Sequence, residues 1–296
     1  MTSNTLRGIL LVVASMACFS IEDMFIKQLS VSLPTGQIMF LLGLGGSLVF
    51  GLMARRQGQS LVSNGALSRP VLFRTMAEAI GALAFITSLG LVPLSTVAAV
   101  FQATPLAITL GAALFLGEKV GWRRWAAIWV GFGGVLLIIR PGLSGFQPAS
   151  LLVLASVIAI AARDLATRRV AAHVSSTVVS FYGFFALVIV GPLLLLVTDS
   201  PRAMDVAITA ILICAMVFGV VGYYFIVAAM RMGDASAVTP FRYTRLIFSL
   251  ILGVAVFGET PDAYTLIGAT IIIATGLYTY IRERRLAAAH APAPAH

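Results

Sequence analysis

Charged residues are scarce in this sequence: Asp, Glu, Lys and Arg make up 10% of the 296 residues, whereas hydrophobic residues make up 59%. A chain with so little charge cannot cover the surface of a water-soluble globule, so the composition excludes a soluble protein and indicates an integral membrane protein. Cysteine is also rare. Because Cys18 and Cys214 both fall within apolar stretches, they predict no disulfide framework.

The motifs of several function classes are absent as well. No G-x-x-x-x-G-K-[ST] motif occurs, which argues against ATP-driven pumping by this chain. His173 is the only histidine before the C-terminal tail, and no H-E-x-x-H motif or acidic metal-binding cluster accompanies it. The sequence therefore disfavours an intramembrane enzyme and predicts no cofactor or metal, while a channel remains a rival to a carrier.

Long apolar stretches recur along the whole chain, each long enough to cross about 30 Å of hydrocarbon as a helix. The connections between them are short, apart from 55–70, so no soluble domain is expected. We predict an all-α integral membrane protein with ten transmembrane helices, followed by a cytoplasmic tail at 282–296. The expected spans are about 5–29, 35–54, 71–91, 94–116, 123–140, 149–170, 176–198, 206–230, 234–257 and 263–281.

The net charge of +9 is distributed as a topology signal. With the N-terminus inside, fourteen basic residues lie at the inner ends of the spans and three, Lys27, Arg140 and Arg202, at the outer ends. This bias predicts that both termini are cytoplasmic; the bacterial inner membrane is the location implied by the family resemblance described below. The same distribution explains the positive charge without a nucleic-acid partner; the expected partners are the lipid bilayer and a small-molecule substrate, with the oligomeric state left open.

The chain resembles itself at an offset of 141 residues. "LLVVASMACFSIED" at 10–23 lies over "LLVLASVIAIAARD" at 151–164, and "FLGE" at 115–118 lies over "VFGE" at 256–259. Because each copy has five spans, an odd number, the second copy must enter the membrane from the opposite side. We expect two inverted five-helix repeats, 5–140 and 149–281, an arrangement that favours alternating access over a fixed pore.

Ionisable residues within the spans must face a cavity or a partner, because lipid cannot solvate them. Spacing of four predicts three pairs within single helices: Asp23 with Lys27, Arg74 with Glu78, and Asp164 with Arg168. Glu22 and Arg163 occupy corresponding positions in the two copies. Because an acid in apolar surroundings can hold a proton, Glu22 and Asp23 are candidates for ion coupling.

Residues 239–250, "TPFRYTRLIFSL", place Arg242 and Arg245 one helical turn apart in an apolar span. Two explanations remain open for Arg245. A carboxylate from another helix, with Glu78 or Glu22 favoured, could neutralise it, or a wet cavity could leave it free for an anionic ligand. Pro240 in this span and Pro105 in the fourth are expected at bends that act as hinges.

Several motifs carry a family resemblance. "PLSTVAAVFQATPL" opens the fourth span, "LGE" closes it before "KVGWRRW", and "GFGGVLLIIRPG" ends the first half. In these features the chain resembles the drug/metabolite transporter superfamily, specifically its EamA-domain members. The resemblance implies a basket of helices around a central cavity, with spans 1, 3, 4, 6, 8 and 9 as the lining of that cavity.

The resemblance also implies a function and completes the expected site. It predicts a secondary transporter of a small metabolite, with amino acids and export favoured, as in exporters of the YddG type; the alternative is an uptake carrier for S-adenosylmethionine, riboflavin or a related metabolite. The substrate-binding candidates are Glu78, Phe101, Gln102, Arg163, Tyr224, Arg242, Tyr243 and Arg245. Glycines in "GLGG" at 43–46 and "GFGG" at 131–134 are expected to permit close helix packing.

Overall fold

The computed structural model describes residues 3–62, 65–118, 121–143, 145–171, 173–198, 200–232 and 239–289, and within these ranges the regular structure is helical throughout. In these ranges ten helices are long and apolar enough to cross a membrane, which confirms the predicted all-α membrane fold. The elements are α1 (Ser3–Ser32), α2 (Thr35–Arg56), α3 (Arg69–Leu91), α4 (Leu94–Phe101), α5 (Thr104–Phe115), α6 (Trp122–Ile139), α7 (Ser150–Thr167), α8 (Ser176–Val197), α9 (Val206–Met232), η1 (Thr239–Tyr243), α11 (Thr244–Phe257) and α12 (Ala263–Ala289).

Local sequence explains most of the helix ends. Pro34 and Pro93 stand immediately before α2 and α4, where a missing N–H costs nothing. Ser175 caps α8 by accepting a hydrogen bond from the backbone N–H of Val178 at 3.2 Å. Gly258 ends α11 in the left-handed region that favours glycine (φ 63°). At the C-terminus α12 continues to Ala289, so part of the segment expected to be a tail is helical.

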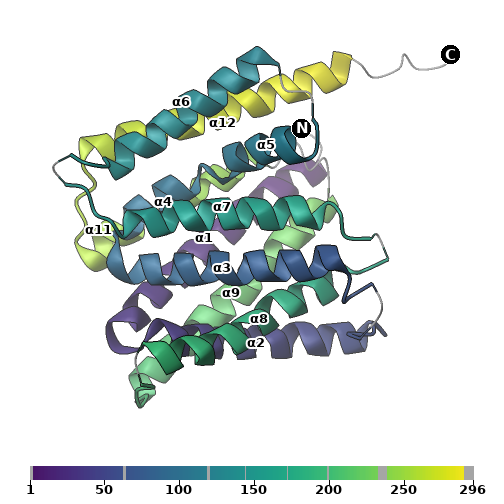
Figure 1. The fold of residues 1–296 in the computed structure, drawn as a ribbon, viewed down its shortest axis with the longest axis vertical. Coiled ribbons are helices and arrows are strands. Elements are labelled where there is room, and N and C mark those ends of the chain that lie inside the picture. The colour runs from purple at the N-terminus through teal and green to yellow at the C-terminus, as the bar shows by residue number, and fades with distance from the viewer. Residues whose placement is uncertain are drawn as a thin grey trace.

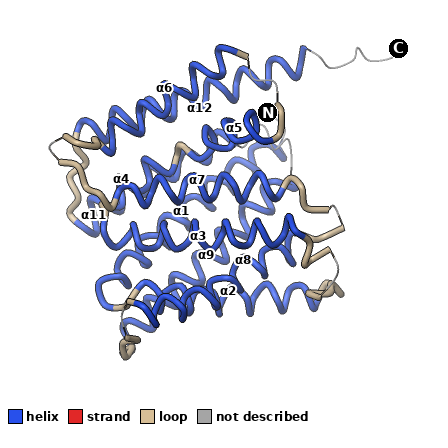
Figure 2. The backbone as a smooth tube through the Cα atoms, viewed as in Figure 1, coloured by secondary structure: helices blue, strands red, loops and turns tan. Residues whose placement is uncertain are grey.

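The helices lie side by side, with α6 and α12 along one edge and α2 and α8 along the other (Figure 1). Figure 2 shows that the described connections are short and gather at the two ends of the helices. The main packing pairs are α1 with α9, α3 with α7, α2 with α8, and α6 with α12. Each pair joins one half of the chain to the other, so neither half forms a separate bundle.

These pairs match the repeat. The 141-residue offset converts α1 into α7 and α3 into α9, so the contact of α1 with α9 corresponds to that of α7 with α3. The offset also converts α2 into α8 and α6 into α12, so each of these two pairs joins a helix to its own counterpart in the other half. Such a contact pattern is the one expected when two inverted copies face each other across a two-fold axis in the membrane plane.

Glycine allows the helices at both edges to approach closely. A Cβ added to Gly191 of α8 would lie 2.5 Å from the carbonyl oxygen of Gly36 in α2, and one added to Gly134 of α6 would lie 2.9 Å from that of Gly268 in α12. Gly43 of α2 similarly faces the backbone of α8. The expectation that "GLGG" and "GFGG" serve helix packing is confirmed.

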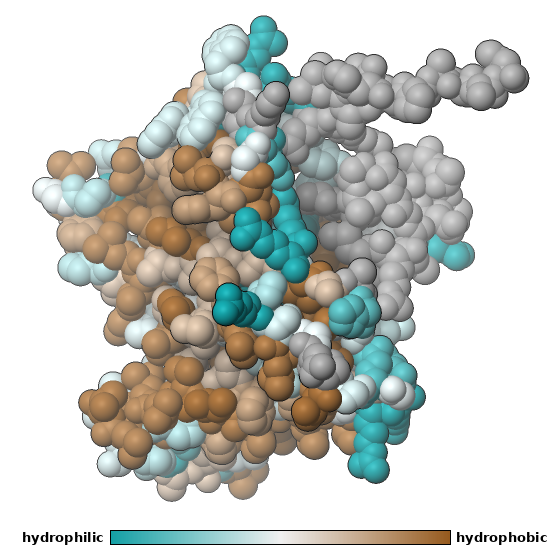
Figure 3. Space-filling model, turned by 45° about the vertical axis from the view of Figure 1, so that its right-hand side comes forward, coloured by the Kyte–Doolittle hydropathy of each residue, from teal (hydrophilic) through white to brown (hydrophobic). Residues whose placement is uncertain are grey.

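The outer surface is largely apolar. Large hydrophobic side chains such as Leu196, Val197 and Ile158 are exposed along the helices, where lipid would cover them. In Figure 3, with the right-hand ends of the helices in Figure 1 turned forward, hydrophobic side chains cover much of the visible face, and the most hydrophilic ones collect from its centre to its right. The polar groups therefore concentrate at helix ends and in the interior.

Candidate functional site

Two helices break at corresponding positions near the middle of the molecule. The fourth span is interrupted at Gln102 and Ala103, between α4 and α5, and the ninth changes from the 3-10 helix η1 to α11 after Tyr243. The 141-residue offset carries Gln102 onto Tyr243. At each break a threonine hydroxyl donates to a carbonyl three residues earlier at 2.6 Å: Thr104 to Phe101 and Thr244 to Phe241. Broken helices free backbone groups beside a cavity, as at many transporter sites.

The expected hinge residues both lie beside these breaks. Pro105 is in the first turn of α5, where its missing N–H needs no partner, and Pro240 lies within η1. Their role as hinges remains a prediction.

Arg245, in the first turn of α11, is neutralised by α1. Its Nη2 and Nε donate to Oδ2 of Asp23 at 2.6 and 3.2 Å. The rings of Phe19, Phe85 and Phe101 surround the guanidinium, with centroids 5.3 to 5.7 Å from Cζ. The first of the two explanations offered for Arg245 therefore applies, but the favoured partners Glu78 and Glu22 were wrong: the carboxylate is Asp23.

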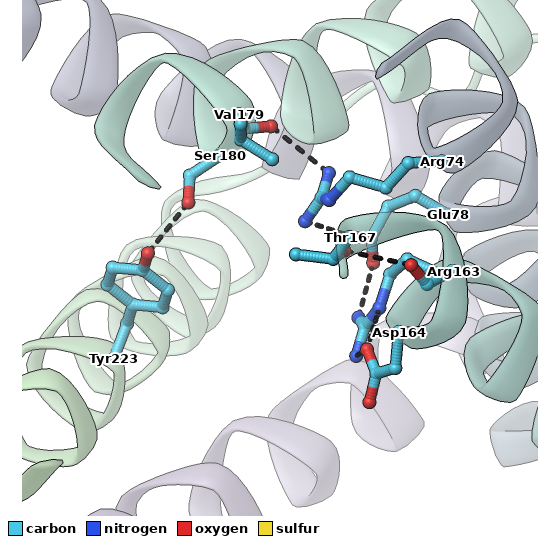
Figure 4. Close-up of polar contacts among 8 residues, drawn as sticks. All are labelled: Arg74, Glu78, Arg163, Asp164, Thr167, Val179, Ser180 and Tyr223. Atoms are coloured by element: carbon cyan, nitrogen blue, oxygen red, sulfur yellow. Dashed lines mark hydrogen bonds and ion pairs between the residues drawn. The ribbon is translucent and has the colours of Figure 1, made fainter. Parts of the chain in front are cut away.

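A second charged group links α3, α7 and α8 (Figure 4). Glu78 forms an ion pair with Arg74 of its own helix at 3.2 Å and accepts a hydrogen bond from Arg163 of α7 at 2.9 Å, with one carboxylate oxygen for each arginine. Arg163 also donates from Nε to Oδ1 of Asp164 at 2.8 Å, and its Nη2 lies 2.7 Å from the same oxygen as an ion pair. Arg74 donates in addition to the carbonyl oxygen of Val179 in α8 at 3.1 Å. This four-residue cluster, with two acids and two bases, is neutral as a unit.

Only one of the three predicted in-helix pairs forms. Arg74 and Glu78 pair as expected. The pairs of Asp23 with Lys27 and of Asp164 with Arg168 were wrong, since both acids instead bind an arginine. The two basic residues pair across helices, Lys27 with Glu259 at 3.6 Å and Arg168 with Glu118 at 2.9 Å. These two pairs correspond to each other, because the offset carries residue 27 to 168 and residue 118 to 259.

Two of the predicted interior charges have no ion-pair partner among the described residues. Arg242 of η1 is exposed, and neither it nor Glu22 of α1 makes a hydrogen bond or ion pair within the described part of the chain. Asp164, Arg163, Arg245 and Tyr243 all act electrostatically on Arg242, and surrounding protein crowds its guanidinium. Part of the residue surface is nevertheless open to solvent. Glu22 faces α9, where a Cβ on Gly219 would lie 2.5 Å from Oε1.

The structure separates the remaining candidates. Phe101 lies against the Arg245 guanidinium, and Gln102 is buried at the break after α4. Tyr243 directs its hydroxyl group at Gly276 of α12. Tyr224 is 65% exposed and is not part of this interior.

Tyr223, which precedes Tyr224 in α9, was not among the predicted site residues. It lies on the inner face of α9, and its hydroxyl is 2.7 Å from that of Ser180 (Figure 4). Asp164 was assigned to Arg168 from the spacing of four, although its sequence neighbour Arg163 is the partner that it binds. In the described residues no group of three or more His, Cys, Asp or Glu side chains could hold a metal ion.

Ten helices of membrane-crossing length in the described residues, interruptions in the fourth and ninth spans, and paired ionisable side chains between the helices are features of a multi-pass membrane protein of the transporter class. The sequence model of the EamA-like transporter family matches residues 6–140 and 147–281, so the chain belongs to that family. Its relatives are carriers, not enzymes.

Two curated relatives match over most of their length. The chain is 28% identical to an S-adenosylmethionine uptake transporter of Rickettsia conorii, over 95% of this chain and 94% of the relative. It is 26% identical to the pseudopaline exporter CntI of Pseudomonas aeruginosa, over 90% of this chain and 93% of the relative. One chain of known crystal structure shares the fold, with a TM-score of 0.65 and 19% identity, over 94% of this chain and 98% of that one.

Proposed function

We propose that this protein is a secondary carrier that moves a small zwitterionic metabolite across a bacterial inner membrane, with amino acids as the first candidates and export favoured. One observation carries the proposal. Arg242 is a permanent charge at a helix break inside a membrane protein, accessible and without an ion-pair partner among the described residues. A guanidinium in that position is suited to a carboxylate, which it can bind with two hydrogen bonds.

Alternating access is supported by a difference between the two ends. At the outer end the Lys27–Glu259 pair is enclosed, with side chains 15% and 9% exposed. The corresponding pair at the inner end, Arg168 and Glu118, is 51% and 40% exposed. The two pairs occupy corresponding positions in the repeat, but one is enclosed and the other is exposed to solvent. We expect this difference in a carrier built from two inverted repeats when it is closed toward the outside and more open toward the cytoplasm.

S-adenosylmethionine uptake is the second candidate. A relative over nearly the whole chain is named for that activity, and the compound carries an amino acid head group that could bind Arg242 as a free amino acid would. Its adenine ring would also find aromatic surface, since Phe19, Phe85 and Phe101 lie together near the break. Riboflavin has neither a carboxylate nor an ammonium group, so it would form no ion pair with Arg242.

Transport by purified protein in liposomes tests the proposal. We expect labelled amino acids, or S-adenosylmethionine, to exchange across the membrane faster than in protein-free liposomes, and an excess of the same unlabelled compound inside to accelerate uptake. Loading the compound inside or outside, with and without a proton gradient, measures direction and coupling. If the protein moves neither compound, and a panel of vitamins and nucleosides includes one that it does move, the zwitterion proposal is overturned. A permeability that shows neither saturation nor counterflow would instead support a channel.

A further inference from the structure

We infer that Asp164 and Arg242 together bind an α-amino acid head group, the ammonium group on Asp164 and the carboxylate on Arg242. This inference rests on the proposed function and goes further by naming the two side chains that select the substrate. Neither the spacing of residues in the sequence nor the relatives assign Asp164 to a substrate.

Asp164 is the one carboxylate of the four-residue cluster with acceptor capacity to spare. The hydrogen bond from Nε of Arg163 and the ion-pair contact of its Nη2 both end on Oδ1 of Asp164, and Oδ2 has no hydrogen-bond or ion-pair partner among the described residues. Glu78, by contrast, uses one oxygen for each of its two arginines. The exposed fractions agree with this difference, since the Asp164 side chain is 37% exposed and that of Glu78 is 19% exposed. A cationic group could therefore reach Asp164 without displacing Arg163.

Arg242 supplies the opposite charge from η1, an element that packs on α1, α11 and α12. It belongs to η1, three residues before Arg245, and its electrostatic attraction is chiefly to Asp164. The two groups nevertheless form no ion pair, so all five N–H donors of the guanidinium remain available to a ligand. Arg245 cannot serve in its place, because Asp23 and three phenylalanine rings already occupy its surroundings.

The pair of charges selects for a zwitterion. A simple anion could bind Arg242, but it would face the negative Asp164 without a cation of its own. A simple cation could bind Asp164, but Arg242, Arg163 and Arg245 would all repel it. An α-amino acid group carries both charges on adjacent atoms and meets a partner for each. The same head group occurs in free amino acids and in S-adenosylmethionine, so this subsite is compatible with both candidate substrates.

Substrate analogues combined with variants test the inference in liposomes containing the whole protein. For the wild type we expect an amino acid amide, which lacks the carboxylate, and a 2-hydroxy acid, which lacks the ammonium group, each to compete roughly 10- to 100-fold less well than the parent amino acid. Arg242→Gln should abolish the preference for the acid over its amide, while Asp164→Asn should abolish the preference for the amino acid over the hydroxy acid. Asparagine can still accept from Arg163, which favours folding of the second variant.

Asp205→Asn and Arg123→Gln are the matched controls, since both side chains are exposed at helix ends outside the charged interior. They should leave both preferences unchanged. The inference is overturned if wild-type protein transports the amino acid but accepts the amide and the hydroxy acid equally well, a result that needs no variant. It is also overturned if folded Asp164→Asn and Arg242→Gln keep both preferences. In either case transport by the wild type would still stand as evidence for the proposed function.

Discussion

The ion pair between Arg245 and Asp23 shows how a single buried charge constrains the chain. Both side chains are largely enclosed, so removing one leaves the other unpaired in apolar surroundings. We expect Arg245→Ala to reduce the free energy of unfolding by about 3–5 kcal/mol and Asp23→Asn combined with Arg245→Gln to recover most of it. Thermal unfolding of the purified protein in detergent, followed by tryptophan fluorescence, measures both effects. An Arg245→Ala variant as stable as the wild type would contradict this structural role.

Residue-scale prediction from the sequence succeeded for the charges and largely failed for their partners. The sequence identified the charges of the four-residue cluster and of the Arg245–Asp23 pair, because a charge in an apolar span stands out. It did not identify Glu259, which lies just beyond a span and is nevertheless only 9% exposed. It paired Arg74 with Glu78 correctly because both lie on one helix, where spacing of four fixes geometry. Arg245 and Asp23 are 222 positions apart, and only the packing of α11 on α1 brings them together.

At the scale of elements, the spans were predictable and their interruptions were only partly so. Nine of the expected spans overlap helices closely because about 20 apolar residues make a strong signal; the expected ninth span, about 234–257, begins in residues outside the described ranges. Nothing at Gln102 and Ala103 in the sequence marks the break between α4 and α5 except Pro105, which follows it. The apolar run continues through the break, so hydropathy alone could not reveal it.

Glu259 connects two such elements and predicts a conformational effect. Its carboxylate accepts from the backbone N–H groups of Leu94 and Ser95 at the start of α4, at 2.5 and 2.9 Å, and pairs with Lys27. Lys27 in turn donates to the carbonyl oxygens of Leu89 and Val92 at the end of α3, at 3.2 and 2.7 Å. These contacts connect α1, α3, α4 and the segment after α11 at the end of the molecule that we predict to be the outer one.

We expect Glu259→Gln to weaken this closure by about 1–2 kcal/mol, because the charge that binds Lys27 and the N-terminus of α4 is lost. The outer end should then open in a larger fraction of molecules. Spin labels at Leu91 and Thr260, both exposed at that end, would show a longer-distance population in the variant. Glu118→Gln, the corresponding change at the inner end, should not lengthen this distance. An unchanged distance distribution in Glu259→Gln would contradict a role in closing the outer end.

At the scale of the whole molecule, the repeat was the most informative feature of the sequence. The 141-residue offset predicted two halves, and the contacts of α1 with α9 and α3 with α7 follow the symmetry that it implies. The offset could not predict where the two copies differ. Glu78 and Arg163 form an ion pair, whereas the corresponding positions are Gly219 and Glu22, so the charged cluster exists in one half of the interior only.

The orientation in the membrane is the remaining prediction. Arg55 and Arg56 end α2, and basic residues gather at the same ends of the other spans, which predicts that these ends and both termini are cytoplasmic. Ser60 lies beyond α2 at that end, and Gln147 lies between α6 and α7 at the opposite end; both are exposed. In a background with Cys18 and Cys214 changed to Ala, a membrane-impermeant maleimide added to intact cells should therefore label Gln147→Cys and not Ser60→Cys. Permeabilised cells should give labelling at both positions, which serves as the control for reactivity. Labelling of Ser60→Cys alone in intact cells would invert the topology and, with it, the assignment of Lys27 and Glu259 to the outer end.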